Sequence, residues 1–133
     1  MTFLDVIHHP HARRCTLVAC VGYWIALFIG THLPPSHVPE LDVSDKVLHG
    51  GGFFVLASLF WLALWAYGVQ PRRRAILVLG VMVLYSALDE ITQGPVGRTP
   101  DLYDFLTDVL SALAATLLWE AAAFVWQKTR AKA

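Results

Sequence analysis

Four long apolar stretches decide what this 133-residue chain can fold into. They cover residues 15–33, 47–69, 75–93 and 102–126, and each is close to the roughly 20 residues with which a helix crosses a bilayer core. A lone sheet leaves backbone groups unsatisfied in lipid, so segments of this type span the membrane as helices. The prediction is an all-α integral membrane four-helix bundle, formed by a single transmembrane domain over residues 1–133.

The composition agrees with a membrane protein. The chain is 56% hydrophobic and 15% charged, with a mean hydropathy of +0.55. An average soluble domain is about 25% charged, so this chain lacks the polar residues to cover a globule in water. Lys plus Arg and Asp plus Glu each number 10. Because no basic excess exists, a nucleic-acid partner is not expected; the expected partner is the lipid bilayer, and the oligomeric state stays open.

The basic residues predict the orientation. Most of them flank the four stretches on one side of the membrane, which the positive-inside rule makes cytoplasmic. The chain is therefore expected to be N-in/C-in, a multi-pass protein of the cytoplasmic membrane with residues 70–74 as a cytoplasmic loop. The basic residues on that side are Arg13, Arg14, Arg72, Arg73, Arg74, Lys128, Arg130 and Lys132, against Lys46 and Arg98 on the other.

The acidic residues gather on the opposite, outer side. Short connections force consecutive helices to be antiparallel neighbours, so these acids are expected to meet at one end of the bundle. Crowded carboxylates in a low-dielectric site share protons or hold a cation. The acids concerned are Glu40, Asp42, Asp45, Asp89, Glu90, Asp101, Asp104 and Asp108.

The second stretch opens with a short polar motif. Asp45 and His49 are four residues apart and share a helix face, with Lys46 on the flank. Asp45 has the alternative role of an N-cap. His49 is the natural proton carrier near neutral pH, and the glycines at 50–52 let neighbouring helices approach closely.

The third stretch ends with Asp89, Glu90 and Gln93, whose spacing lets the carboxamide pair with either acid. Thr99 and Pro100 predict the N-cap and first turn of the fourth helix. A stripe of acids then follows at positions i, i+3 and i+7, of which the first is a cap or helix-dipole partner: Asp101, Asp104 and Asp108.

Glu90 and Asp108 lie a turn or more inside their spans, where a carboxylate is expensive and marks a functional site. A general acid–base role fits a cluster of Glu90, His49 and Asp89. Arg98 and Lys46 are the candidates to hold an anionic head group, because a guanidinium suits phosphate. Further binding candidates are Gln93, Asp45, Asp104 and Asp108. A metal held by His49 and Glu90 is an open alternative, and the sequence indicates no particular cofactor.

These motifs resemble the VanZ-like family of bacterial membrane proteins, named for an accessory factor in teicoplanin resistance. The family's pattern has D-K-x-x-H opening one helix, D-E-x-x-Q closing the next, and R followed by D-x-x-x-N at the start of another. Asp108 replaces the family's usual Asn and Ser111 its usual Gly, which affects the charge of the site and the closeness of helix packing. Over roughly residues 45–118 the matching positions are Asp45, Lys46, His49, Asp89, Glu90, Gln93, Arg98 and Asp104.

The resemblance implies a membrane bundle of the bacterial cell envelope whose polar cluster is important for its function. It does not indicate a particular reaction. Teicoplanin is a lipoglycopeptide that acts at the outer leaflet, where an outward-facing cluster would meet such molecules or lipid-linked wall precursors. Three hypotheses follow. The cluster binds or acts on an amphiphilic head group, as an enzyme or as a binder; it holds the bundle together through interhelical hydrogen bonds; or it relays protons or ions along the acidic stripe.

Overall fold

The computed structural model describes residues 9–34, 36 and 44–130 and contains four long helices. They are α2 (Pro10–Thr31), α3 (Asp45–Ala66), α4 (Pro71–Gln93) and α5 (Leu102–Arg130), with a short 3-10 turn η2 (Gly94–Val96) after α4. All four are long and apolar enough to cross a membrane. The part of the chain that the structure describes contains no strand. The prediction of an all-α membrane bundle is confirmed.

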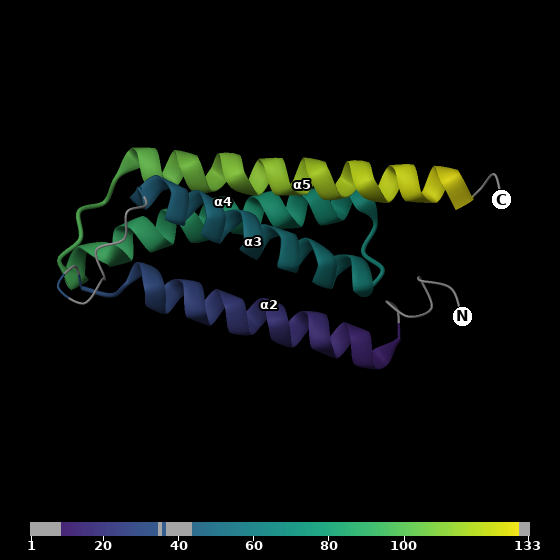
Figure 1. The fold of residues 1–133 in the computed structure, drawn as a ribbon, viewed down its shortest axis with the longest axis horizontal. Helices are drawn as coiled ribbons and strands as arrows, with labels where there is room; N and C mark the ends of the chain where they lie inside the picture. Colours follow the sequence, from purple (N-terminus) through teal and green to yellow (C-terminus); the bar gives the residue numbers. More distant parts are fainter. Residues whose placement is uncertain (1–8, 35, 37–43, 131–133) are drawn as a thin grey trace.

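The helices run up and down in chain order (Figure 1). α3 packs closely against α5 and against α2, while α4 packs mainly against α5. α2 therefore lies at the side of the bundle and has little contact with α4. The start of α2 and the end of α5 lie at the same end of the bundle, and η2 lies at the other (Figure 1).

The helix ends differ from the predicted stretches because capping and turn chemistry set them, whereas hydropathy marks only the apolar middle. α2 begins at Pro10, where a proline suits the first helical position. α3 ends at Ala66 because Gly68 takes a left-handed conformation (φ 76°). The loop predicted at residues 70–74 is wrong: α4 begins at Pro71, so the three arginines at 72–74 lie in its first turn.

The core mixes large side chains of α3 and α4 with small ones of α5. Phe53, Trp61 and Met82 are fully buried against Ala112 and Ala115. Glycine allows the closest approach, because a Cβ on Gly50 would lie 3.0 Å from Ser111 Oγ. A small residue at each position lets α3 and α5 approach closely, as in many membrane bundles.

The outer surface is apolar and the interior contains buried polar groups. Large side chains such as Leu84, Ile91, Leu110 and Phe124 are more than half exposed. Buried polar residues include Thr31, His49, Arg74, Ser86, Asp89, Glu90, Gln93, Asp104, Asp108 and Thr116. This arrangement suits a bilayer, where lipid faces the apolar surface and polar groups find partners inside the bundle.

Candidate functional site

The side chains of the three predicted polar motifs meet at the end of the bundle formed by the start of α3, the end of α4 and the start of α5. Six of the nine predicted site residues are buried, and Asp45, Lys46 and Arg98 lie closer to the surface. The buried ones are His49, Asp89, Glu90, Gln93, Asp104 and Asp108.

Asp89 is fully buried and bound by donors from two helices. Its Oδ1 accepts a hydrogen bond from Thr31 Oγ1 of α2 at 2.8 Å, and its Oδ2 accepts one from Gln93 Nε2 at 2.9 Å. His32, just past α2, places Nδ1 3.7 Å from Oδ1. The carboxamide of Gln93 thus pairs with Asp89 and not with the adjacent Glu90.

Asp108 is also fully buried and lies between α3 and α4. Its Oδ2 accepts a hydrogen bond from Ser86 Oγ at 2.9 Å, and His49 Nδ1 lies 3.3 Å from its Oδ1. Asp108 is therefore the carboxylate partner of His49, and this contact joins α5 to α3.

Glu90 reaches toward the start of α5. Its Oε2 accepts a hydrogen bond from the backbone N–H of Asp101 at 2.7 Å. Its Oε1 is buried and has no hydrogen-bond partner among the described residues, and the same holds for Asp108 Oδ1. Glu90 Oε1 therefore keeps unused capacity to accept a proton, a hydrogen bond or a cation, whereas Asp108 Oδ1 faces His49 Nδ1 at 3.3 Å.

Lys46 of α3 forms ion pairs with two acids at the start of α5. Its Nζ donates to Asp104 Oδ1 at 2.9 Å and to Asp101 Oδ2 at 3.1 Å. Asp101 Oδ1 also accepts from the N–H of Tyr103 at 2.8 Å, so Asp101 caps α5. This N–H and the Lys46 ammonium hold the pKa of Asp101 below its usual value of 3.8.

Two capping predictions need correction. Thr99 was expected to cap the fourth helix, but that helix begins at Leu102 and Asp101 caps it, because Pro100 precedes the cap instead of occupying the first turn. Ser44, not Asp45, caps α3: Ser44 Oγ accepts from the N–H of Val47 at 3.4 Å. Asp45 is thereby left on the first turn, where its carboxylate faces Arg98.

Arg98 comes from the connection between η2 and α5 and reaches back over the end of α2. Its Nε donates to the Leu33 carbonyl at 3.1 Å, and its Nη1 lies 4.0 Å from Asp45 Oδ1. The second contact is a loose ion pair, since Asp45 is largely exposed and water screens such pairs.

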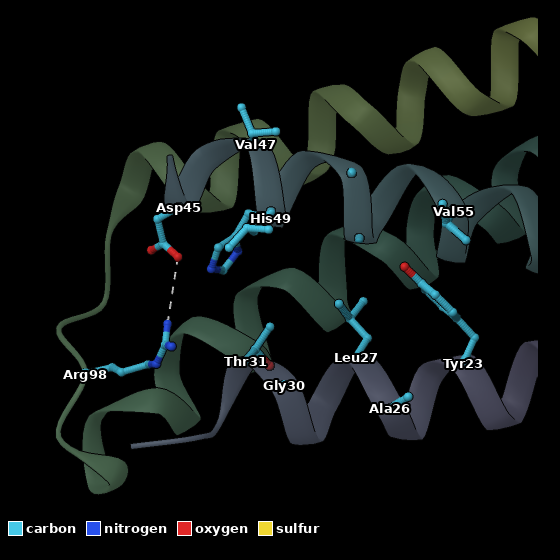
Figure 2. A pocket seen from close by; sticks show the side chains of 13 residues that line it. Tyr23, Ala26, Leu27, Gly30, Thr31, Asp45, Val47, His49, Val55 and Arg98 are labelled. Carbon is cyan, nitrogen blue, oxygen red and sulfur yellow. Dashed lines mark ion pairs between the residues drawn. The ribbon is translucent and has the colours of Figure 1, made fainter. Parts of the chain in front are cut away.

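A groove of about 620 Å³ opens between α2 and α3 beside this cluster. Figure 2 shows its two unlike ends: Arg98, Asp45 and His49 lie at one, while Tyr23, Leu27 and Val55 extend away along α2 and α3. Gly51 lines the groove, and a Cβ there would meet nothing within 4 Å, so a larger side chain at this position has open space to occupy. The groove is thus polar at one end and apolar along its length.

Among the described residues, two sets of side chains are close enough together to hold a metal ion. In one, His49, Asp89 and Glu90 each offer a ligand atom and all are buried. In the other, His49 is joined by Asp45 and Asp104. In both sets the ligand atoms lie within 4.8 Å of one another.

Three partners of the site were not predicted from the sequence: Thr31, His32 and Ser86. Thr31 and His32 are adjacent near the end of the first apolar stretch, and Ser86 is a single polar residue inside the third. The only signal that could have found them is helical register, since Ser86 lies three residues before Asp89, on the same side of α4.

A second polar cluster, at the opposite end of the bundle, was also not predicted from the sequence. Arg74 is buried and donates to Glu120 through Nε (2.8 Å) and Nη2 (2.6 Å), while Trp61 Nε1 donates to the same carboxylate at 2.8 Å. The guanidinium also lies over the Trp61 ring, 4.4 Å from its centroid. From the sequence, Arg74 was interpreted only as an indicator of orientation.

Comparison with known proteins gives one positive result. A family model described as VanZ/LLP1 matches residues 23–125, which include every predicted site residue. No curated protein and no solved structure matches the chain.

Proposed function

Because the chain belongs to the VanZ/LLP1 family and has four helices that can cross a membrane, we propose that it binds an anionic amphiphile from the outer leaflet. The groove between α2 and α3 takes the apolar tail, and Arg98 at its polar end takes the head group. The observation that supports this most is the groove itself, whose volume lies within the roughly 300–1,000 Å³ of ligand pockets.

The chemistry at the polar end favours an anionic head. A guanidinium binds phosphate or carboxylate through paired hydrogen bonds, and Arg98 has only a loose ion pair with Asp45. Lys46 has a different role in this proposal, because Asp101 and Asp104 hold its ammonium and it does not line the groove. Arg98 is therefore the principal head-group ligand.

Any reaction on the bound head group would use His49 and Glu90. Ligand atoms of the two side chains lie within 4.8 Å of each other, so one labile proton is within reach of both. His49 also lines the groove. Head groups of this class at the outer leaflet include lipid-linked wall precursors and lipoglycopeptides, which connects the proposal to the cell envelope and to teicoplanin resistance.

A second candidate function is structural. The polar cluster links all four helices, through Thr31 to Asp89, Ser86 to Asp108 and Lys46 to Asp104. Such bonds are each worth about 0.6–2 kcal/mol in a membrane bundle. Under this alternative the cluster stabilises the bundle, and variants of the groove change no binding.

Native mass spectrometry of the purified chain distinguishes the two functions. The probes are phosphatidylglycerol and a polyprenyl phosphate, with phosphatidylcholine as the zwitterionic comparison. Gly51→Leu fills the groove, Arg98→Gln removes the guanidinium, and Gly80→Leu is the matched control, because Gly80 is exposed on α4 away from the groove.

We expect one anionic lipid per wild-type chain, retained by Gly80→Leu. Affinity should fall at least about tenfold in Gly51→Leu and in Arg98→Gln, which corresponds to about 1.4 kcal/mol. Equal lipid retention by all four proteins, or a preference for phosphatidylcholine, would reject the proposal and favour the structural function.

A further inference from the structure

The buried part of the polar cluster contains a carboxylate oxygen that lacks a partner. Glu90 is 6% exposed, and its Oε1 has no hydrogen-bond or ion-pair partner among the residues that the structure describes. Asp108 Oδ1, by contrast, lies 3.3 Å from His49 Nδ1. Buried polar atoms in folded proteins nearly always have a partner, so an orphaned carboxylate oxygen in this site indicates a proton or an ion.

We propose that His49, Asp89 and Glu90 bind one divalent transition-metal ion beside the polar end of the groove. The three side chains come from α3 and α4, and their ligand atoms all lie within 4.8 Å of one another. One imidazole and two carboxylates make the nitrogen–oxygen set that suits zinc or manganese.

Neighbouring residues hold these three side chains in place by hydrogen bonds, as the outer partners of metal ligands do in known sites. Thr31 and Gln93 fix Asp89, and the N–H of Asp101 fixes one oxygen of Glu90. His49 turns Nδ1 toward Asp108 at 3.3 Å. A carboxylate on one ring nitrogen orients the imidazole and leaves the lone pair of the other, Nε2, for a metal.

The charge of the surrounding side chains also favours a metal ion bound by His49, Asp89 and Glu90. Asp89, Glu90 and Asp108 bring three formal negative charges into the buried part of the site, where His49 Nδ1 lies 3.3 Å from Asp108 and His32 Nδ1 lies 3.7 Å from Asp89. A divalent ion offsets charge that is costly inside a bilayer. The overlapping set with Asp45 and Asp104 is the weaker one, because Asp45 is exposed and Lys46 already neutralises Asp104.

Zinc binding to the full chain in detergent tests the inference. The purified protein is stripped with a chelator and titrated with Zn²⁺ against a chelating dye, and bound zinc is counted by elemental analysis. No lipid probe is present, so this test can fail while head-group binding holds, and the reverse.

Three proteins are compared with wild type: Glu90→Gln, His49→Gln and the double variant His9→Ala/His11→Ala. The last is the control for adventitious binding, because His9 and His11 are exposed and stack with ring centroids 5.2 Å apart. Two site variants are used so that one remains if the other does not fold.

We expect one zinc per chain in wild type and in the His9/His11 variant. Affinity should fall at least about 100-fold in either site variant, since even the loss of an outer partner costs about 10–100-fold. Zinc below one per chain in wild type, unchanged affinity in the site variants, or loss of zinc in the His9/His11 variant alone would each overturn the inference.

Discussion

Buried carboxylates in the polar cluster differ in how many of their oxygens accept a hydrogen bond: Asp89 uses both, whereas Glu90 uses one. Asp108 accepts from Ser86 through Oδ2, and Glu90 accepts from the N–H of Asp101 through Oε2. The other oxygen of each is left without a hydrogen bond among the described residues. Leaving a buried polar group without its hydrogen-bond partner costs more free energy than the hydrogen bond itself contributes. An isosteric substitution that keeps the bond should therefore cost less stability than a truncation that removes it.

Asp108 allows that difference to be measured. Asp108→Asn retains a carbonyl oxygen for Ser86, so the free energy of unfolding should stay within about 1 kcal/mol of wild type. Asp108→Ala leaves Ser86 and His49 without this partner and should cost about 2–3 kcal/mol. Unfolding of the three proteins in detergent gives both values. If the asparagine variant were as unstable as the alanine variant, the charge and not the hydrogen bond would be what stabilises the site.

Asp101 gives a prediction of pH dependence. Its pKa is lowered in the folded chain by the N–H of Tyr103 and by Lys46, so its ionised form stabilises the fold above its usual value of 3.8. This stabilisation is lost as the pH falls through the lower, folded pKa. Asp101→Asn keeps the cap and removes the charge. Its melting temperature should lie below that of wild type near neutral pH, and the difference should shrink in acid; a difference that grows in acid contradicts the assignment.

At the scale of helices, the sequence predicted the middle of each helix but not the residues at which each helix begins and ends. Apolar runs locate the part of each helix that faces lipid, and all four predicted spans overlap α2 to α5. The ends depend on single residues with special backbone chemistry. Pro71 starts α4 and so brings Arg74 into the helix, where it turns inward to Glu120. A hydropathy profile carries no information on such capping, so the second cluster was missed.

The glycines of α3 provide two neighbouring positions with opposite environments. A Cβ on Gly50 would lie 3.0 Å from Ser111 Oγ and 3.1 Å from Thr107 Cγ2, whereas one on Gly51 would meet nothing within 4 Å. Gly50→Val should therefore force α3 from α5 and cost about 1–3 kcal/mol of unfolding free energy. Gly51→Val, the matched control, should keep the wild-type melting temperature. Equal loss of stability in both would mean that helix propensity, not packing, sets the effect.

The whole molecule has a polar cluster at each end of an apolar bundle. The sequence predicted that the acids of α3, α4 and the start of α5 meet at the first cluster, since helix order alone brings them together. Glu40 and Asp42, which were expected to join them, lie outside the described residues. It could not predict that Asp89 contacts Thr31 or that Asp108 contacts Ser86, because these contacts depend on how each helix is rotated about its axis. Side-chain pairing across helices is a property of the assembled bundle and not of any one stretch.

The second cluster ties α3, α4 and α5 through Trp61, Arg74 and Glu120. Glu120→Ala leaves a buried guanidinium without its anion. We expect a loss of about 2 kcal/mol, less than the roughly 3–5 kcal/mol of a fully buried pair, because water reaches part of Glu120. The double variant Arg74→Leu/Glu120→Leu should recover part of that stability in the same unfolding assay. A double variant less stable than Glu120→Ala would show that the Arg74–Glu120 pair stabilises the fold by more than the free energy needed to bury its two charges.

The charges at the two ends of the bundle predict its orientation in the membrane. The end where α2 begins and α5 ends carries most of the basic residues, and the positive-inside rule predicts that such an end faces the cytoplasm. With Cys15 and Cys20 replaced by serine, Thr99→Cys and Lys128→Cys report opposite ends of the bundle. A membrane-impermeant maleimide added to intact cells should label the cysteine at 99, whereas the cysteine at 128 should react only after permeabilisation. The reverse pattern would place the groove's polar end in the cytoplasm and would move the proposed head-group site to the inner leaflet.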